Sequence, residues 1–261
     1  MTRSENLDRI IAQLSLDNGV TATLPHSLSE KQSLMRALMN IRQPVAASDD
    51  FLKAQDQELQ LQNLDKGIVT IDDIAEKNNY QLSTDDCQFL LWQGDITRLK
   101  VDAIVNAANA QMLGCWHPLH KCIDNCIHSS AGVQLRQECY EIMRRQGHDE
   151  PTATAKITSG YNLPAKHVIH TVGPIVADGV PTKEQENQLA TCYRSCLDIA
   201  EENHLTSIAF CCISTGVFRF PNRRAAEIAV ATVRAYPHKW LKTIVFNVFL
   251  DKDYEIYRQL L

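Results

Sequence analysis

Apolar residues in the first part of the chain recur at helical spacing within a polar background. Four of them stand at positions i, i+3, i+4 and i+7, namely Leu7, Ile10, Ile11 and Leu14. This spacing predicts an amphipathic helix. A second helix is predicted to begin at Ser27 or Ser29, because Glu or Gln follows each three residues later, and to stop at Pro44. Residues 51–64 predict a third helix, and Thr70 is suited to cap a fourth.

From about Asp85 the pattern changes to short apolar runs that alternate with helical stretches, which is typical of an α/β layered fold. Six runs are predicted strands: residues 88–92, 103–106, 155–158, 167–171, 207–213 and 243–249. They are uniformly apolar, as expected when helices cover both faces of a sheet. We therefore predict an N-terminal helical extension over residues 1–84, packed on the main domain or docking a partner, and an α/β domain over residues 85–261.

Composition narrows the class of protein. A hydrophobic fraction of 44% suits a globular domain with a core, and the net charge of −5 argues against general nucleic-acid binding, which needs a basic face. No apolar run approaches the roughly 20 residues that span a bilayer. Nine unevenly spaced cysteines favour a reducing compartment over a disulfide framework. We expect a cytoplasmic protein that binds neither nucleic acid nor a membrane.

Three polar segments each follow a predicted strand: residues 94–97, 106–124 and 214–218. Because ligand sites gather outside the carboxyl ends of strands in such sheets, these segments are candidates to line one cleft. Asp95 fits an acceptor for the amino group of adenine, or it simply caps a turn. The hydroxyl-rich turn that begins at Ser214 offers backbone N–H groups suited to a pyrophosphate.

The second segment contains the residue types that bind metal ions. Cys115, His120 and Cys122 offer thiolate and imidazole ligands, which zinc prefers. Three protein ligands leave a fourth position for water or substrate, and the nearby carboxylate of Asp124 favours chemistry over scaffolding. His117 lies in the same loop and competes with His120 as a ligand. The spacing is not that of a zinc finger, and free cysteines are often small core residues.

Several ordered segments together resemble a macrodomain, the ADP-ribose-binding α/β/α module. They are Gly-Asp-Ile-Thr at 94–97, Val-Asp-Ala-Ile-Val-Asn-Ala-Ala-Asn at 101–109, Ile-His-Ser-Ser-Ala-Gly at 127–132, Ile-His-Thr-Val-Gly-Pro at 169–174 and Ser-Thr-Gly-Val-Phe at 214–218. The resemblance covers about residues 85 to 261 and implies a three-layer fold with a mixed central sheet. It implies that Asp95 and Ile96 hold the adenine. The implied pyrophosphate contacts are Ser214, Thr215, Gly216, Val217 and Phe218, with the N–H groups of Ile123 and Asn125.

The chain departs from most macrodomains after Asn109, where a loop with cysteines and histidines replaces a glycine run. This loop resembles that of the zinc-containing macrodomains of microbes, protein-ADP-ribose hydrolases that also carry an N-terminal helical extension. The resemblance implies Zn²⁺ bound by Cys115, His120 and Cys122. Asp124 falls on the catalytic position of hydrolytic macrodomains. Asn125 replaces their usual glycine, and asparagine tolerates positive φ better than most residues.

The resemblance also implies a mechanism. Asp124 would orient the attacking water or accept its proton, and Asn109 would fix the hydroxyls of the distal ribose. Zinc would either activate a water or polarise a ribose oxygen. His128, His170 and Cys126 are interpreted as buried supporting groups.

The primary hypothesis is a hydrolase that removes mono-ADP-ribose from acidic side chains of proteins. Its implied substrate is an ADP-ribosylated protein, its product is free ADP-ribose, and its implied partner is a sirtuin-type ADP-ribosyltransferase. The alternative is an ADP-ribose reader with structural zinc and no turnover.

Overall fold

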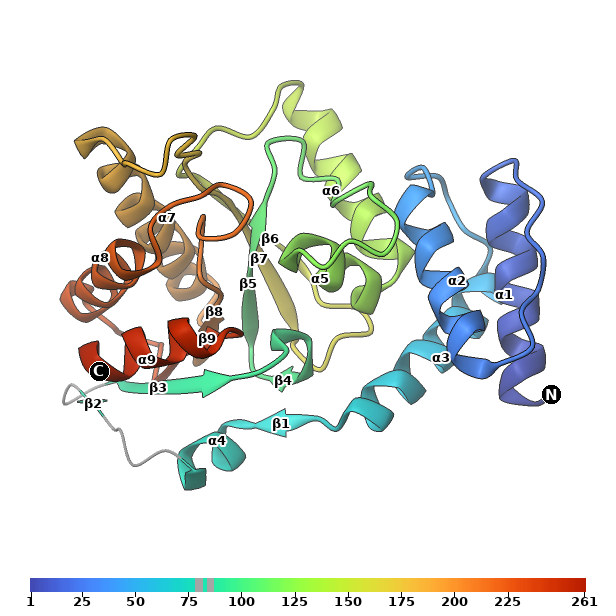
Figure 1. The fold of residues 1–261 in the computed structure, drawn as a ribbon, viewed down its shortest axis with the longest axis horizontal. Helices are drawn as coiled ribbons and strands as arrows, with labels where there is room; N and C mark the ends of the chain where they lie inside the picture. Colours follow the sequence, from blue (N-terminus) through green and yellow to red (C-terminus); the bar gives the residue numbers. More distant parts are fainter. Residues whose placement is uncertain (78–81, 84–86) are drawn as a thin grey trace.

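Three helices from the start of the chain pack on one another at one end of the molecule (Figure 1). They are α1 (Arg3–Asp17), α2 (Leu28–Ile41) and α3 (Asp49–Lys66). Ser27 rather than Ser29 begins α2, because its Oγ accepts the N–H of Glu30 at 3.3 Å. The helix ends at Ile41, ahead of Pro44. This computed structural model describes residues 1–77, 82–83 and 87–261, so the predicted domain boundary between residues 84 and 85 lies outside the described residues.

The extension has an apolar core of its own that continues into the main domain. The predicted stripe of α1 is fully buried there, against residues of α2 and α3. Val133, which opens helix α6, belongs to the same cluster. Burying this stripe stabilises α1 far more than its helix propensity does. The three helices are therefore packed against the α/β domain through a shared core.

The central sheet has the strand order β2-β3-β9-β8-β5-β7-β6. Its strands are β2 (Leu82–Ser83), β3 (Gln88–Gln93), β5 (Ala103–Ala108), β6 (Ala155–Ser159), β7 (His167–Val172), β8 (Ser207–Phe210) and β9 (Thr243–Val248). The five inner strands are parallel and both outer ones antiparallel, so the sheet is mixed. All six predicted strands are confirmed, although β8 ends at Phe210, earlier than predicted. Two short strands, β1 (Val69–Thr70) and β4 (Leu99–Lys100), pair separately.

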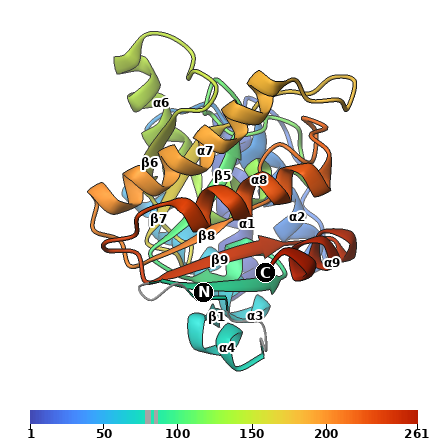
Figure 2. The same ribbon diagram turned by 90° about the vertical axis from the view of Figure 1, so that its left-hand side faces the viewer.

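Helices cover both faces of the sheet, which gives the three-layer α/β/α fold that the resemblance implied (Figures 1 and 2). On one face lie α7 (Lys183–Glu202), α8 (Asn222–Ala235) and α9 (Asp251–Leu260). On the other lie α5 (Ile123–Ala131) and α6 (Val133–Gln146). The short α4 (Ile71–Lys77) follows β1, and the 3-10 helix η1 (Ile96–Arg98) follows β3. No helix in the described part of the chain is long and apolar enough to cross a membrane.

The parallel strands place the predicted ligand segments at one edge of the sheet. Strands β3, β9, β8 and β5 run in the same direction, so their carboxyl ends meet there. Gly94, Asn109 and Phe249 directly follow β3, β5 and β9, and Ser214 follows β8 after three residues. This edge is where ligands bind in open α/β sheets.

Candidate active site

The loop between β5 and α5 brings together the three predicted metal ligands. Cys115 Sγ lies 3.6 Å from His120 Nδ1, and the ligand atoms of Cys115, His120 and Cys122 all lie within 4.8 Å of one another. His117 is not part of this group, and its backbone carbonyl accepts a hydrogen bond from the side chain of Asn125. Of the two histidines in the loop, His120 is the one that lies beside the two thiols.

The geometry and chemistry of this cluster fit a zinc ion. Tetrahedral bonds of about 2.3 Å to sulfur and about 2.0 Å to nitrogen would separate those two atoms by about 3.5 Å. This is close to the 3.6 Å between Cys115 Sγ and His120 Nδ1. Burial, opposed by the N–H of Asn125 and reinforced by Cys115, raises the pKa of the Cys122 thiol to about 12. A cation is therefore what would hold this sulfur as a thiolate at neutral pH. Three ligands leave one coordination position for a non-protein group.

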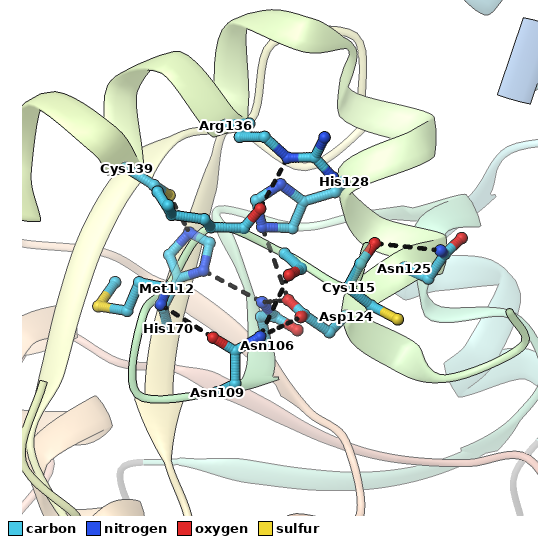
Figure 3. A network of polar contacts seen from close by, with 12 residues as sticks. Asn106, Asn109, Met112, Cys115, Asp124, Asn125, His128, Arg136, Cys139 and His170 are labelled. Atoms are coloured by element: carbon cyan, nitrogen blue, oxygen red, sulfur yellow. Dashed lines mark hydrogen bonds and ion pairs between the residues drawn. The ribbon is translucent and has the colours of Figure 1, made fainter. Parts of the chain in front are cut away.

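Asp124 is a buried carboxylate held by two asparagines (Figure 3). Its Oδ1 accepts a hydrogen bond from Asn106 Nδ2 at 2.8 Å, and its Oδ2 accepts one from Asn109 Nδ2 at 3.3 Å. Burial raises the pKa of Asp124 to about 6, although the hydrogen bond from Asn106 and the charge of Arg136 oppose the rise. The carboxylate is fixed in direction and gains or loses its proton near neutral pH.

A layer of neutral polar side chains supports Asn106 from behind (Figure 3). His170 is fully buried on β7, with Nδ1 3.1 Å from Asn106 Nδ2 and Nε2 2.9 Å from Thr158 Oγ1. Burial lowers its pKa to about 3, so the ring is neutral. His128 is also buried, with Nε2 3.6 Å from Asp124 Oδ1, and burial lowers its pKa well below the usual range. His170 is confirmed as a hydrogen-bonded core histidine, whereas His128 is buried but its ring nitrogens have no hydrogen-bond partner among the described residues.

His128 and His170 also form a second Cys/His group with Cys139, whose ligand atoms lie within 4.8 Å of one another. All three residues are buried. His170 already uses both ring nitrogens, and burial raises the pKa of the Cys139 thiol far above neutrality. This group is therefore part of the buried core.

Asn109 shapes the start of the loop at residues 109–122. Its Oδ1 accepts the N–H groups of Gln111 and Met112, each at 3.1 Å, and its Nδ2 also donates to the carbonyl of Gly114. Gly114 has a φ of +80°, and a Cβ there would lie 2.8 Å from the ring of His128. Only glycine fits this position without strain. These contacts fix the direction in which the loop leaves β5, and the Asn109 side chain faces Asp124.

Asp95 caps η1 at the carboxyl end of β3. Its Oδ1 accepts the N–H of Thr97 at 3.0 Å and the Thr97 hydroxyl at 2.7 Å, whereas its Oδ2 lies 4.0 Å from Lys66 Nζ. The capping role is thus confirmed. The side chain remains 38% exposed, so the cap leaves room for a second contact, while the neighbouring Ile96 is buried.

The turn at residues 214–218 presents unpaired amide groups. Ser214 has a φ of +66° and packs so closely on Gly173 that a Cβ at Gly173 would clash with its Oγ. Among the described residues, the N–H groups of Gly216, Val217 and Phe218 have no hydrogen-bond acceptor. Successive free amides of this kind suit an anion. No hydrogen bond in the described part of the chain joins this turn to α5.

Known proteins are similar to this chain in both sequence and fold. The Macro domain family matches residues 105–229. A protein-ADP-ribose hydrolase of Treponema medium is 50% identical, over the full length of both chains. Another, from Staphylococcus aureus strain MRSA252, is 49% identical over 93% of this chain and 89% of its own length. The chain belongs to the macrodomain family.

Solved macrodomains have the same architecture. The Oceanobacillus iheyensis macrodomain with ADP superposes with a TM-score of 0.63 at 36% identity, covering 69% of this chain and 93% of its own. The Trypanosoma brucei macrodomain in complex with ADP-ribose gives a TM-score of 0.65 at 28% identity, covering 91% and 97%. The match to the Treponema medium protein also covers the N-terminal extension of this chain, so the two sequences are similar there as well.

Three further residues of this macrodomain belong to the site's geometry and were not assigned to it from the sequence. Asn106 donates a hydrogen bond to Asp124. The sequence feature that could have identified it is its position as a polar residue inside an apolar strand. Phe249 is 72% exposed at the carboxyl end of β9, beside Gly94, whose N–H donates to Val248. Arg36, on α2, donates to the backbone carbonyl of His120 in the loop at residues 109–122, and nothing in the sequence pattern indicated this contact.

Proposed function

We propose that this macrodomain protein hydrolyses the bond between C1 of the distal ribose of ADP-ribose and a protein side chain. The observation that carries the proposal is the buried Asp124, clamped by Asn106 and Asn109 on the helix that begins beside the Cys115 cluster. The relatives named protein-ADP-ribose hydrolase support it, because one of them is 50% identical over its whole length. The substrate class is mono-ADP-ribose on aspartate or glutamate side chains.

The proposed ligand lies along the carboxyl edge of the sheet. Asp95 and Ile96 bind the adenine, and the exposed ring of Phe249 stacks on it. The free amides of residues 216–218 bind the pyrophosphate, together with the N–H of Ile123 at the start of α5. The N–H of Asn125, which the resemblance assigned to the pyrophosphate, donates instead to Cys122 Sγ at 3.4 Å.

Asp124 acts on the attacking water. It orients the water toward C1 of the ribose and accepts a proton as the new C–O bond forms, and the bond to the side-chain oxygen breaks. The proton then returns to the released carboxyl group, so the products are ADP-ribose and the free acidic side chain. Asn106 and Asn109 keep both carboxylate oxygens in place during these transfers, and Asn109 also contacts the ribose hydroxyls.

We further propose that Cys115, His120 and Cys122 hold Zn²⁺, which supplies a Lewis acid and a positive charge beside the distal ribose. The modified substrate comes from an ADP-ribosyltransferase of the sirtuin type. A cytoplasmic location is proposed on the nine cysteines, which a reducing compartment keeps as thiols.

The test uses a mono-ADP-ribosylated protein as substrate. Asp124→Asn should lower the rate of ADP-ribose release at least about 100-fold, because a positioned proton acceptor is lost, while the binding of free ADP-ribose is kept. Asp72→Asn, on the exposed side of α4, is the matched control and should release ADP-ribose at the normal rate. Chelation should lower the rate, and added zinc should restore it.

The outcome separates the enzyme from a reader. Tight binding of ADP-ribose by the zinc-loaded protein without any release would favour a binding module with a structural metal. Full turnover by Asp124→Asn would instead remove Asp124 from the mechanism.

A further inference from the structure

Arg36 on helix α2 of the extension contacts the metal-binding loop, residues 109–122. Arg36 Nη2 donates to the carbonyl of His120 at 2.8 Å and to Asn125 Oδ1 at 2.8 Å, and its Nε lies 3.3 Å from the same Oδ1. Its partners are 84 and 89 residues away in sequence, and one is the backbone of a candidate ligand. A guanidinium with two acceptors makes charge-assisted contacts with fixed direction.

Asn125 carries this contact onward into the loop (Figure 3). It is fully buried in the first turn of α5, and its Nδ2 donates to the carbonyls of His117 at 2.9 Å and Cys115 at 3.4 Å. Its N–H donates to Cys122 Sγ. Asn125 has no positive φ, so conformational freedom is not why asparagine stands here. Its side chain instead joins Arg36 to the Cys115 and His117 carbonyls, and its backbone N–H contacts Cys122.

Asn40, one turn further along α2, makes a second contact. Its Oδ1 accepts the N–H of Leu119 at 2.9 Å, and its Nδ2 donates to Ser129 Oγ at 2.9 Å. Leu119 has a φ of +58°, which is uncommon for a non-glycine residue, and it directly precedes His120. The buried amide of Asn40 thus holds the loop in a less favoured backbone conformation next to a ligand.

We propose that Arg36 and Asn40 are positioning residues of the metal-binding loop and that Asn125 couples Arg36 to the ligands. The loop contains neither helix nor strand, so its ligands are ordered by contacts from outside it. A preordered loop loses less conformational entropy when it binds an ion, and groups that orient metal ligands raise metal affinity. The N-terminal extension is therefore a working part of the active site. This inference rests on the proposed function.

The experiment measures how fast the full-length, zinc-loaded protein releases zinc to a chromophoric chelator. Arg36→Met removes the guanidinium but keeps the apolar stem, so the packing of α2 is retained. Release should be at least about 10-fold faster than in the natural protein. Arg36→Lys has one donor nitrogen in place of two, so its rate of zinc release should lie between those of Arg36→Met and the natural protein. Arg9→Met, on the exposed side of α1 and paired with Asp50 alone among the described residues, should release zinc at the normal rate.

A second measurement distinguishes positioning from simple stabilisation. In the Asn125→Gly background, Arg36→Met should accelerate zinc release less than it does alone, because part of the same network is already lost. Equal zinc release by Arg36→Met and Arg9→Met, or equal effects in both backgrounds, would overturn the inference. A natural protein that takes up no zinc would overturn the metal site itself, and this inference with it. Normal zinc retention without hydrolysis would contradict only the proposed activity.

Discussion

Gly114 shows how one residue sets the geometry of the site. It lies one residue before Cys115, with positive φ and with the ring of His128 directly over its Cα. The carbonyl of Gly114 accepts from Asn109, which also contacts Asp124. A side chain at this position would push the loop away from the two groups that the proposed chemistry needs.

Gly114→Ala should lower the free energy of unfolding by about 2–4 kcal/mol, because a strained backbone conformation and a steric clash add together. Gly147→Ala is the matched control, since Gly147 has a φ of +78° with open space around it. It should cost only about 1 kcal/mol. Urea denaturation measures both. Equal losses would show that the contact with His128 is relaxed at no cost.

For single residues, the sequence predicted which side chains are candidates for chemistry better than it predicted which side chains contact one another. The cysteines and His120 were found because few residues bind soft metal ions, and Asp124 was found because it stands in a family motif. Arg36 was not found, because a charged residue on an amphipathic helix normally faces water. Asn125 was noted as a departure from the family, but its role depends on a helix almost ninety residues earlier, which no local pattern shows.

At the scale of elements, the ends of the strands matter more than their middles. The apolar runs predicted the six longer strands, because each places apolar side chains in the core or against it. The two-residue strands β1, β2 and β4 were missed, because two residues are too few for a pattern. Helix α6 was also missed, since its buried face contains Arg136 and so lacks a clean apolar stripe.

Phe249→Ala tests the proposed adenine end of the site. Loss of the stacking surface should weaken ADP-ribose binding by about 10-fold or more, at about 1–3 kcal/mol per stacked base, with no change in the rate at saturating substrate. Isothermal titration calorimetry gives the affinity. Leu250→Ala, at the next exposed position, serves as the control. Unchanged affinity in Phe249→Ala would place the base elsewhere.

For the whole molecule, Arg136 joins the extension to the α/β domain. This buried side chain on α6 donates to the carbonyls of Met39 and Arg42 at the end of α2, and to that of Leu113. Its guanidinium also lies 4.2 Å from the ring centroid of Trp116. Burial lowers the pKa of Arg136 to about 10, which still leaves it charged at neutral pH. A buried cation with three carbonyl partners fixes how the two parts meet.

Arg136→Met should lower the free energy of unfolding by about 3 kcal/mol or more, because three carbonyls lose their charged donor. All three tryptophans lie outside residues 1–84, so their fluorescence reports on the α/β domain, whereas far-UV circular dichroism also reports the extension. In urea the two signals should coincide for the natural protein and separate in Arg136→Met. Arg145→Met, exposed on the same helix, should leave both transitions in place. Coincident, unshifted curves for Arg136→Met would contradict the prediction.

The contacts between α2 and residues 109–122 also bear on which macrodomains can carry this loop. A macrodomain that gained this loop without the helix would carry cysteines and a histidine with nothing to hold them in register. One that lost the helix and kept the loop would be left with exposed, oxidisable thiols. We therefore expect the helix and the loop to occur together in related proteins, although almost ninety residues separate them. Grafting the loop alone onto a plain macrodomain would transfer the ligands but not the site.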